Sequence, residues 1–185
     1  NEFLGQEPDI QDKSTSLYTL KNAAITFDNV HFTYDDTGIH ALNGVSFSLE
    51  EGKTLAVMGP TGAGKTTLLQ LLSKTYLPHS GQVMLGGKSI NEYAQRDIRK
   101  AMGVVPQQPF LFSDTIANNI RFGKHDATEK EIEAAAKQAA VHDNIIEFTA
   151  KYDTMLGERG ITLSGGQKQR VSIARALIRK PKLLL

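Results

Sequence analysis

The chain has 185 residues, of which 40% are hydrophobic and 22% are charged, and its formal net charge at pH 7 is +1. These values suit one globular domain, or one domain with an appended lobe, and the nearly balanced charge gives no reason to expect a nucleic-acid partner, which usually binds through a strongly basic face. The sequence has no cysteine, which excludes disulfides and thiolate metal sites. No apolar run approaches the roughly 18 residues that a membrane-spanning helix requires.

The N-terminal part of the sequence predicts a linker followed by strands. Residues 1–22 are polar and aperiodic, which is typical of a linker. Apolar and polar residues then alternate over residues 25–34 and again over 45–49, as expected for strands with one buried face. Leu55–Met58 is instead a continuous apolar run, and we expect it to form a strand that is buried on both faces.

The patterns that follow predict a helix, a hairpin and a helical middle section. Residues 68–72 are rich in leucine and give the first helix a broad apolar side. Residues 82–85 precede two glycines and resemble half of a hairpin. Thr128 and Glu131 have the spacing of a capping box, and the alanine-rich residues 134–140 favour a helix.

The C-terminal part of the sequence predicts a last helix and a strand. The helix begins near Gly165, carries apolar residues at helical spacing, and must end by Lys180 because Pro181 follows. Another apolar run, Leu183–Leu185, then begins a strand.

A glycine-rich loop separates the predicted buried strand from the first helix. Its sequence, Gly-Pro-Thr-Gly-Ala-Gly-Lys-Thr, matches the phosphate-binding pattern G-x-x-x-x-G-K-[ST]. Glycines let successive N–H groups point at phosphate oxygens, and the following helix adds its positive dipole end. Lys65 supplies a full charge for the β and γ phosphates, and the Thr66 hydroxyl suits Mg²⁺. We therefore expect a nucleoside triphosphate to contact Gly59, Pro60, Thr61, Gly62, Ala63, Gly64, Lys65, Thr66 and Thr67.

A second glycine-containing segment, Leu163-Ser164-Gly165-Gly166-Gln167, opens the last predicted helix. Alone, this pattern fits a flexible capped turn at least as well as an anion site. Together with the phosphate loop, however, it makes the sequence from about Ala24 to the last residue resemble the nucleotide-binding domain of ABC transporters of the exporter type. Leu-Ser-Gly-Gly-Gln is the signature of that family.

The resemblance implies roles for further residues. Tyr34 matches the aromatic that stacks on adenine, although a strand-end aromatic otherwise belongs more often to a core. Gln107 matches the glutamine that touches Mg²⁺ and senses the γ-phosphate, so that Lys65 and Gln107 are the catalytic candidates in this sequence. Phe110–Phe112 resembles the patch that receives the coupling helices of a membrane domain, with burial in the domain's own core as an equal alternative. Gly157–Gly160 resembles a loop typical of exporters.

The resemblance also implies an architecture. The expected fold is α/β: a RecA-like phosphate-loop core, an antiparallel β lobe and an α-helical lobe over about residues 108–161, with the C-terminal part of the sheet missing. Residues 1–22 would form a linker from a membrane domain, and residues 23–185 would form a nucleotide-binding domain that is incomplete at its C-terminus.

The family pattern further implies a mechanism in which two domains enclose ATP. Two such domains, identical or different, would pair head to tail with ATP and Mg²⁺ between them. Thr66 and Gln107 would contact Mg²⁺. The ATP on one domain's phosphate loop would also be contacted in trans by the other domain's Ser164, Gly165, Gly166 and Gln167. ATP would drive closure, and hydrolysis would reverse it.

The remaining catalytic groups of the family, a strand-end Asp, its adjacent Glu and a switch His, would follow Leu185. Asp97, Asp114 and Glu158 are more simply interpreted as turn and cap residues, and the histidines have no metal-ligand spacing. Because positioning and charge stabilisation do nearly all the work in phosphoryl transfer, we expect residues 1–185 alone to be a poor ATP hydrolase.

The preferred hypothesis is an ATP-driven exporter whose ATP-binding domain lies on the cytoplasmic face of the cell membrane. An importer subunit would lack the match at Gly157–Gly160. A soluble ABC protein of translation or DNA repair would show a second domain or a long coiled-coil insertion, together with a basic face. A degenerate partner that binds ATP without hydrolysing it remains open, because the deciding residue would follow Leu185.

Overall fold

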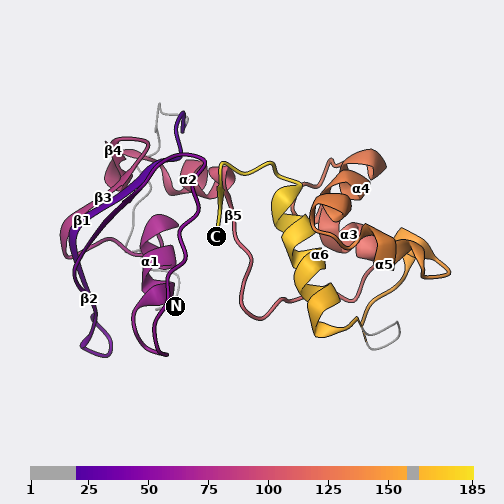
Figure 1. Ribbon diagram of the computed structural model, residues 1–185, viewed down its shortest axis with the longest axis horizontal. Helices are drawn as coiled ribbons and strands as arrows, with labels where there is room; N and C mark the ends of the chain where they lie inside the picture. The colour runs from indigo at the N-terminus through magenta and orange to yellow at the C-terminus, as the bar shows by residue number, and fades with distance from the viewer. Residues whose placement is uncertain (1–19, 158–162) are drawn as a thin grey trace, which may run out of the picture. The chain divides into compact units, whose positions relative to one another are not determined.

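The computed structural model describes residues 20–157 and 163–185, and the chain divides into two compact units, Asn1–Ala101 and Met102–Leu185 (Figure 1). The first unit holds an antiparallel sheet with short helices, and the second consists mainly of helices. The chain is thus an α/β protein with an antiparallel β lobe and an α-helical lobe, as predicted. Within the described residues, none of the helices has the length and apolar character needed to cross a membrane.

The sheet of the first unit is built from β1 (Ile25–Tyr34), β2 (Ile39–Leu49), β3 (Ser80–Leu85) and β4 (Lys88–Ser89). Their order is β2-β1-β3-β4, and all of the pairings are antiparallel. The alternating patterns of residues 25–34 and 45–49 therefore did predict strands. Gly86 and Gly87 join β3 to β4 with φ values of 60° and 77°, which confirms the predicted hairpin.

Helix α1 (Lys65–Leu72) lies next to the sheet of the first unit (Figure 1), and hydrogen bonds from Tyr34 join it to β1. It buries Leu68, Leu71 and Leu72, as its apolar pattern predicts. Phe27 and Leu85 of the sheet are almost completely buried as well. The short helices η2 (Ile90–Glu92) and α2 (Gln95–Ala101) complete the unit.

The prediction of a buried strand at Leu55–Met58 is wrong in this structure. These residues belong to no strand, and the exposed fractions of Leu55 and Met58 are 45% and 91%. A strand of a parallel sheet needs a neighbour that satisfies its backbone N–H and C=O groups. Among the described residues, no strand pairs with this segment, so its hydrophobicity alone does not make it a strand.

The second unit consists mainly of helices packed on one hydrophobic core. Its elements are β5 (Met102–Gly103), α3 (Ile116–Arg121), α4 (Glu129–Gln138), α5 (His142–Ile146), η3 (Lys151–Asp153), α6 (Gly165–Leu177) and β6 (Leu183–Leu184). The core includes Ile120 of α3, Ala136 of α4 and Val171 of α6, all of which are almost completely buried. The strands β5 and β6 pair in parallel, which confirms the strand predicted after the last helix.

The predicted capping box at the start of α4 is present, and a second box, which was not predicted, opens α6. At the start of α4, the Thr128 hydroxyl accepts from the N–H of Glu131, whose carboxylate accepts from the N–H of Thr128 at 2.9 Å. Helix α4 ends at Gln138, slightly earlier than the alanine-rich pattern suggested, and Ala140 has a left-handed φ of 52°. The equivalent box at the start of α6 belongs to the candidate site described below.

Candidate nucleotide-binding site

The phosphate loop lies between β2 and α1 and depends on its glycines. Gly62 and Gly64 have φ values of 83° and 82°, in the left-handed region that favours glycine. A Cβ on Gly64 would also lie 2.3 Å from the carbonyl oxygen of Ala41 and 2.9 Å from Cδ2 of Leu42. The end of the loop is therefore packed directly against β2, which fixes the point at which α1 starts.

The N-terminus of α1 is suited to bind an anion. Gly64 is the N-cap residue and cannot offer a side-chain cap, and no acidic residue stands in the first turn. The first N–H groups of a helix have no partner within the helix, and the helix dipole places partial positive charge there. A phosphate group would satisfy these donors, so the backbone of the loop fits a triphosphate.

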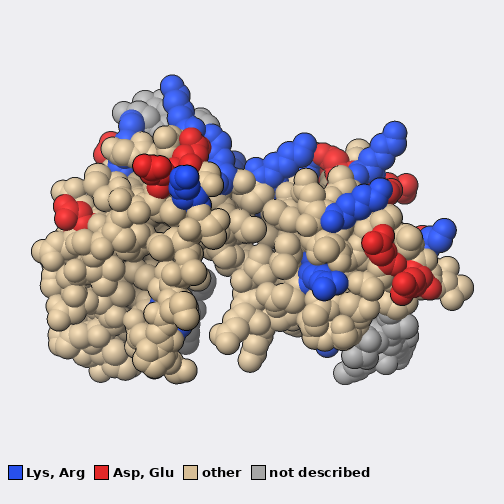
Figure 2. All heavy atoms as spheres, viewed as in Figure 1, with Lys and Arg blue, Asp and Glu red and all other residues tan. Residues whose placement is uncertain are grey.

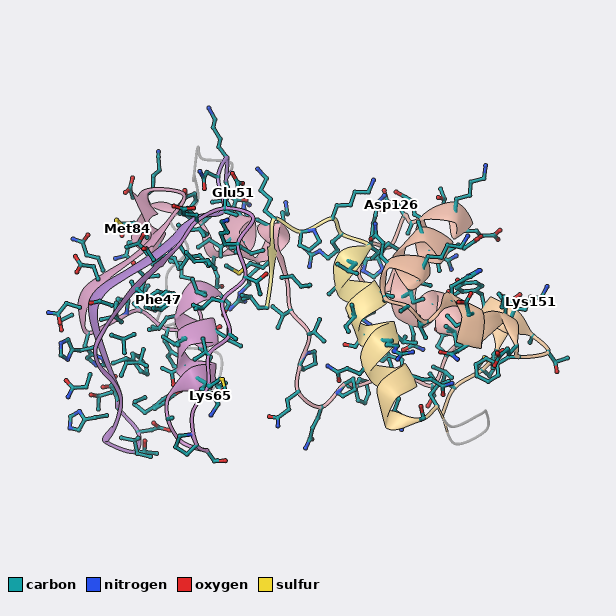
Figure 3. All side chains as sticks on the ribbon, in the orientation of Figure 1. Phe47, Glu51, Lys65, Met84, Asp126 and Lys151 are labelled. Atoms are coloured by element: carbon teal, nitrogen blue, oxygen red, sulfur yellow. The ribbon has the colours of Figure 1, made fainter. Side chains whose placement is uncertain are left out.

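Lys65 lies at this end of α1 (Figure 3) and adds a full positive charge. Its ammonium donates to the carbonyl oxygens of Gly59 and Pro60 at 2.8 and 2.6 Å, which closes the loop on itself. Phosphate oxygens are stronger acceptors for an ammonium group than neutral carbonyls are. We therefore expect the phosphate oxygens of a bound triphosphate to replace the two carbonyls as acceptors, with the Lys65 ammonium still at the loop.

The two threonines after Lys65 differ in what they can offer to a ligand. Thr66 is exposed, so its hydroxyl is available as a hard oxygen ligand for Mg²⁺. Thr67 is almost fully buried, and its hydroxyl lies 3.0 Å from the hydroxyl of Tyr34. The contact expected for Thr67 would thus involve its backbone N–H. The described residues contain no group of three His or acidic side chains that could hold a metal by themselves.

Tyr34 stands at the end of β1, where two hydrogen bonds fix its ring to α1. Its hydroxyl donates to Oε1 of Gln70 at 2.7 Å and also contacts Thr67. The rings of Phe32 and Tyr76 meet the Tyr34 ring edge to face, with centroids 5.0 and 5.6 Å away. The aromatic predicted to receive adenine is therefore held next to the phosphate-loop helix.

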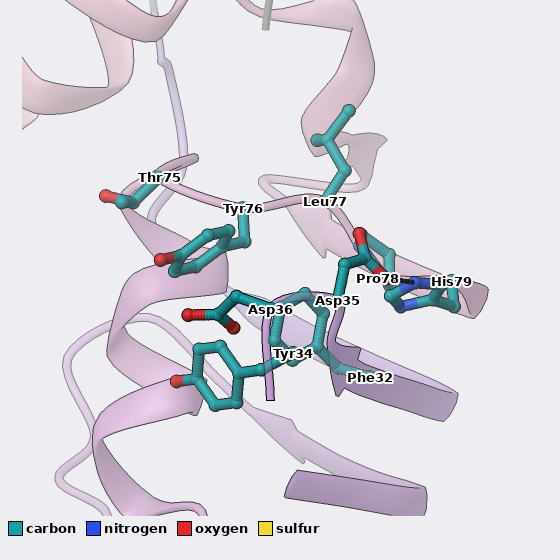
Figure 4. A pocket seen from close by; sticks show the side chains of 9 residues that line it. All are labelled: Phe32, Tyr34, Asp35, Asp36, Thr75, Tyr76, Leu77, Pro78 and His79. Atoms are coloured by element: carbon teal, nitrogen blue, oxygen red, sulfur yellow. Dashed lines mark hydrogen bonds and ion pairs between the residues drawn. The ribbon is translucent and has the colours of Figure 1, made fainter. Parts of the chain in front are cut away.

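A cavity of about 440 Å³ adjoins the Tyr34 ring (Figure 4). It is lined by Phe32, Tyr34, Asp35, Asp36 and the segment Thr75–His79. Tyr76 and His79 also line the cavity, although no sequence pattern predicted them as site residues. An aromatic residue shortly before a proline in a loop was the only local signal, and the position of that loop depends on where β3 begins.

The signature segment opens α6 in the second unit. Ser164 is the N-cap residue: its hydroxyl accepts from the N–H of Gln167 at 3.2 Å, and Oε1 of Gln167 accepts from the N–H of Ser164 at 2.9 Å. Ser164, Gly165 and Gly166 are all exposed. The structure thus presents a helix N-terminus to solvent, as the sequence pattern predicts.

The glycines of the signature segment serve no packing purpose within the described unit. A Cβ on Gly165 or Gly166 would have no heavy atom within 4 Å, and neither residue has a positive φ. A glycine in a helix costs about 1 kcal/mol relative to alanine. The cost is smaller in the first turn of a helix, where both glycines lie, and no contact within the described unit requires glycine at either position.

Gln107 is exposed and follows β5 in the second unit. The carbonyl oxygen of its neighbour Pro106 accepts a hydrogen bond from Nε2 of Gln169 at 3.5 Å, which ties this segment to α6. The structure thus brings Tyr34 together with the phosphate loop in the first unit. It places Gln107 and Ser164–Gln167 in the second unit.

The segment around Phe110 presents aromatic side chains to solvent. Leu111 packs against the core of the second unit, but Phe110 has an exposed fraction of 65%, so the alternative of core burial does not hold for this side chain. Asp114 is a turn residue, because its carboxylate accepts from the Asn118 side chain and from the N–H of Thr115, and these two bonds, the Asn118 bond first, lower the pKa of the carboxyl group. Of the predicted exporter loop, residues 158–160 lie outside the described residues.

Charged side chains of both signs lie close together on the face drawn in Figure 2. Lys124 and Glu131 form an ion pair at 2.5 Å, and Lys137 and Glu133 form another at 2.6 Å. The hydrogen bond from Lys124 lowers the pKa of Glu131 to about 2. The first pair joins the capping box of α4 to the preceding turn, and the second links successive turns along α4.

Comparisons with known proteins agree with this geometry. Residues 42–185 match the sequence profile of the family described as ABC transporter. The chain is 44% identical over its whole length to mouse ATP-binding cassette sub-family B member 6, of which it covers 22%. It is 45% identical over its whole length to a Bacillus subtilis protein described as the uncharacterized ABC transporter ATP-binding protein YfiB, of which it covers 32%.

The fold is also similar to that of a bacterial Atm1-family ABC exporter solved with ATP bound. The TM-score is 0.91 at 41% sequence identity, and the match covers 99% of this chain and 32% of the exporter chain. The chain thus spans between a fifth and a third of the length of these relatives. With a profile match over most of its length and relatives above 40% identity, the chain belongs to the ABC transporter family.

Proposed function

We propose that this chain is the ATP-binding domain of a membrane exporter, and that it closes with a second domain of its kind around ATP to drive export. The observation that carries the proposal is a pair of helix N-termini that both suit an anion. One is the uncapped start of α1 beside Lys65, and the other is the start of α6 with its exposed glycines. Each alone would leave one side of a triphosphate in water.

The phosphate loop would hold the β and γ phosphates through its backbone N–H groups and the Lys65 ammonium. The exposed Thr66 hydroxyl fits one Mg²⁺ ligand, and Gln107 is proposed as a second on the sequence resemblance alone. The ion would neutralise charge on the phosphates during transfer. Tyr34 would stack on the adenine ring, with its orientation fixed by Gln70 and Thr67.

The second half of the clamp would come from another domain, identical or different. The proposal places Ser164, Gly165, Gly166 and Gln167 of that domain over the phosphates bound by the first. The empty space around both glycines supports it, because close approach of a phosphate to the backbone is a physical reason to retain glycine in a helix. Association would then depend on ATP, and hydrolysis would weaken it.

The proposed membrane partner would be the cytoplasmic part of a membrane domain whose coupling helices meet Phe110–Phe112. Two observations support this partner: Phe110 is exposed, and relatives such as the Atm1-family exporter are transporters several times longer than this chain. The domain would then work on the cytoplasmic face of the cell membrane. Related domains also occur in other membranes, as the name of Arabidopsis ABC transporter B family member 24, mitochondrial, shows.

The proposal is tested most simply by Lys65→Ala in the intact protein, with ATP affinity measured by equilibrium titration. Loss of a charge-assisted contact of about 1.5–3 kcal/mol predicts an affinity roughly 10–100-fold weaker. Lys53→Ala removes an exposed lysine from the same unit and serves as the matched control, with affinity unchanged. Equal ATP affinity in Lys65→Ala and the parent would refute the proposed site.

A further inference from the structure

The last residues of β1 extend beyond the strand that pairs with them on one side. The register between β1 and β3 ends at His31 and Ser80, whereas β1 continues to Tyr34. A longer β3 would have to include Pro78, which has no N–H and cannot donate to a ladder. On this side, the backbone around Tyr34 therefore needs hydrogen-bond partners other than a strand.

His79 supplies such partners. Its backbone N–H donates to the carbonyl oxygen of His31 at 2.9 Å, and its Nδ1 accepts from the N–H of Thr33 at 3.3 Å. Because Nδ1 is the acceptor in this bond, the ring proton lies on Nε2. Nε2 is 3.3 Å from Oδ1 of Asp35, so the ring donates to this carboxylate (Figure 4). One histidine thus continues the hydrogen bonding that β3 leaves incomplete.

The two ring contacts of His79 flank Tyr34, since they reach the residue before it and the residue after it. The hydroxyl of Tyr34 is fixed separately, by Gln70 and Thr67 of α1. The Phe32 ring lies 5.0 Å from the Tyr34 ring and 5.4 Å from the His79 ring, between centroids. The Tyr34 side chain is therefore held at its tip by α1 and at its backbone by His79.

Polar contacts, rather than packing, distinguish histidine from other residues at position 79. The His79 side chain is 46% exposed, so hydrophobic burial contributes little to keeping it there. His79 and Tyr34 also line the same cavity of about 440 Å³ (Figure 4). The contacts of His79 thus act on the wall of the site at which adenine is proposed to stack.

We propose that His79 is a positioning residue for the nucleotide base, which holds the backbone on both sides of Tyr34 and so orients the ring for stacking before ATP arrives. This inference rests on the function proposed above and deepens it, because it concerns the same site. A surface that is ordered in advance loses less conformational freedom on binding than a mobile one. The contribution of His79 is therefore to the binding of the base and not to that of the phosphates, which the phosphate loop and Lys65 are proposed to hold.

The test compares two ligands by equilibrium titration of the intact protein: ATP, and inorganic triphosphate, which has no base. His79→Ala removes both ring contacts. His79→Asn keeps an oxygen near the position of Nδ1 and so retains only the acceptor for Thr33. His79→Gln keeps an N–H donor near the position of Nε2 and so retains only the contact with Asp35. His125→Ala is the matched control, because it removes an exposed histidine from the second unit.

His79→Ala should bind ATP about two- to tenfold more weakly, the range expected for loss of one neutral hydrogen bond. Its affinity for inorganic triphosphate should equal that of the parent, and His125→Ala should bind both ligands as the parent does. His79→Asn should recover most of the loss, because its oxygen accepts from the backbone N–H that β3 leaves without a partner, and His79→Gln should recover less. In a Tyr34→Ala background, His79→Ala should have no further effect, because it acts through the Tyr34 ring.

The inference is overturned if His79→Ala binds ATP as tightly as the parent, or if it loses equal affinity for both ligands. The same loss with and without the Tyr34 ring would overturn it as well. If His79→Ala does not fold, His79→Asn and His79→Gln carry the comparison, and equal ATP affinities in these two variants count against the positioning role. Lys65→Ala distinguishes a failure of the proposed function: unchanged affinity for both ligands in that variant would refute the nucleotide site itself.

Discussion

Gly166→Ala separates a structural from a functional role for the signature glycines. The added Cβ would meet no heavy atom within 4 Å, and the residue lies within α6 with no positive φ. Alanine is favoured over glycine in a helix by about 0.5–1 kcal/mol, an effect that is smaller in the first turn. We therefore expect Gly166→Ala to leave the free energy of unfolding unchanged or to raise it by up to about 1 kcal/mol.

The same substitution should prevent ATP-dependent pairing of two domains, because the methyl group would stand where a phosphate of the partner's ATP is proposed to lie. The assays are thermal unfolding, with an expected rise of at most about 2–4 °C, and the mass of the ATP-bound complex by light scattering. Thr149→Ala, at an exposed position of the same unit, is the control for pairing. Normal pairing of Gly166→Ala would refute the clamp, and a large loss of stability would refute the account of the glycines.

Three further predictions follow from the geometry of the two units. Gly64→Ala should lower the free energy of unfolding by about 2–5 kcal/mol, because Gly64 has a positive φ and the new Cβ would clash with the Ala41 carbonyl. Gly62→Ala also has a positive φ but meets no atom, so it should cost only about 1 kcal/mol; chemical denaturation measures both variants. Tyr34→Ala should weaken ATP binding about tenfold through loss of a stacking surface, while Tyr34→Phe, which keeps the ring, should lose at most a few-fold; equal losses would count against stacking. The pKa of Glu131 is lowered to about 2, so its contribution to stability is complete above its unfolded pKa near 4.5 and is lost as the pH falls toward 2. Glu131→Gln should therefore make the melting temperature depend less on pH between about 4.5 and 2, whereas the control Glu129→Gln should leave this dependence as in the parent.

Local sequence signals predicted local structure well. The capping box predicted at Thr128 needs only residues three positions apart, and it is present; the similar box at Ser164 has the same spacing but was not predicted. The hairpin glycines and the apolar side of α1 are similarly local, and the structure confirms them. The phosphate loop and the signature segment could be found for the same reason, since each consists of consecutive residues.

Features that depend on distant neighbours were not predicted. Leu55–Met58 has the composition of a buried strand, but a strand requires a pairing partner, and none of the described residues provides one. Arg175 contacts Phe110 and Asn119 across 65 and 56 residues of sequence. Tyr76 joins the Tyr34 pocket only because the loop before β3 folds back beside β1. No local pattern signals contacts of this kind.

The measurement that tests the central claim most directly is the distance between two spin labels on paired domains of the intact protein. Residues 1–185 contain no cysteine, so Lys168→Cys in the first turn of α6 provides one labelling position in this domain once any cysteine elsewhere in the intact protein has been replaced. We predict that ATP with Mg²⁺ shifts the distribution to a single shorter distance, and that Lys65→Ala abolishes the shift. The same distance distribution with and without ATP in the parent would contradict the account.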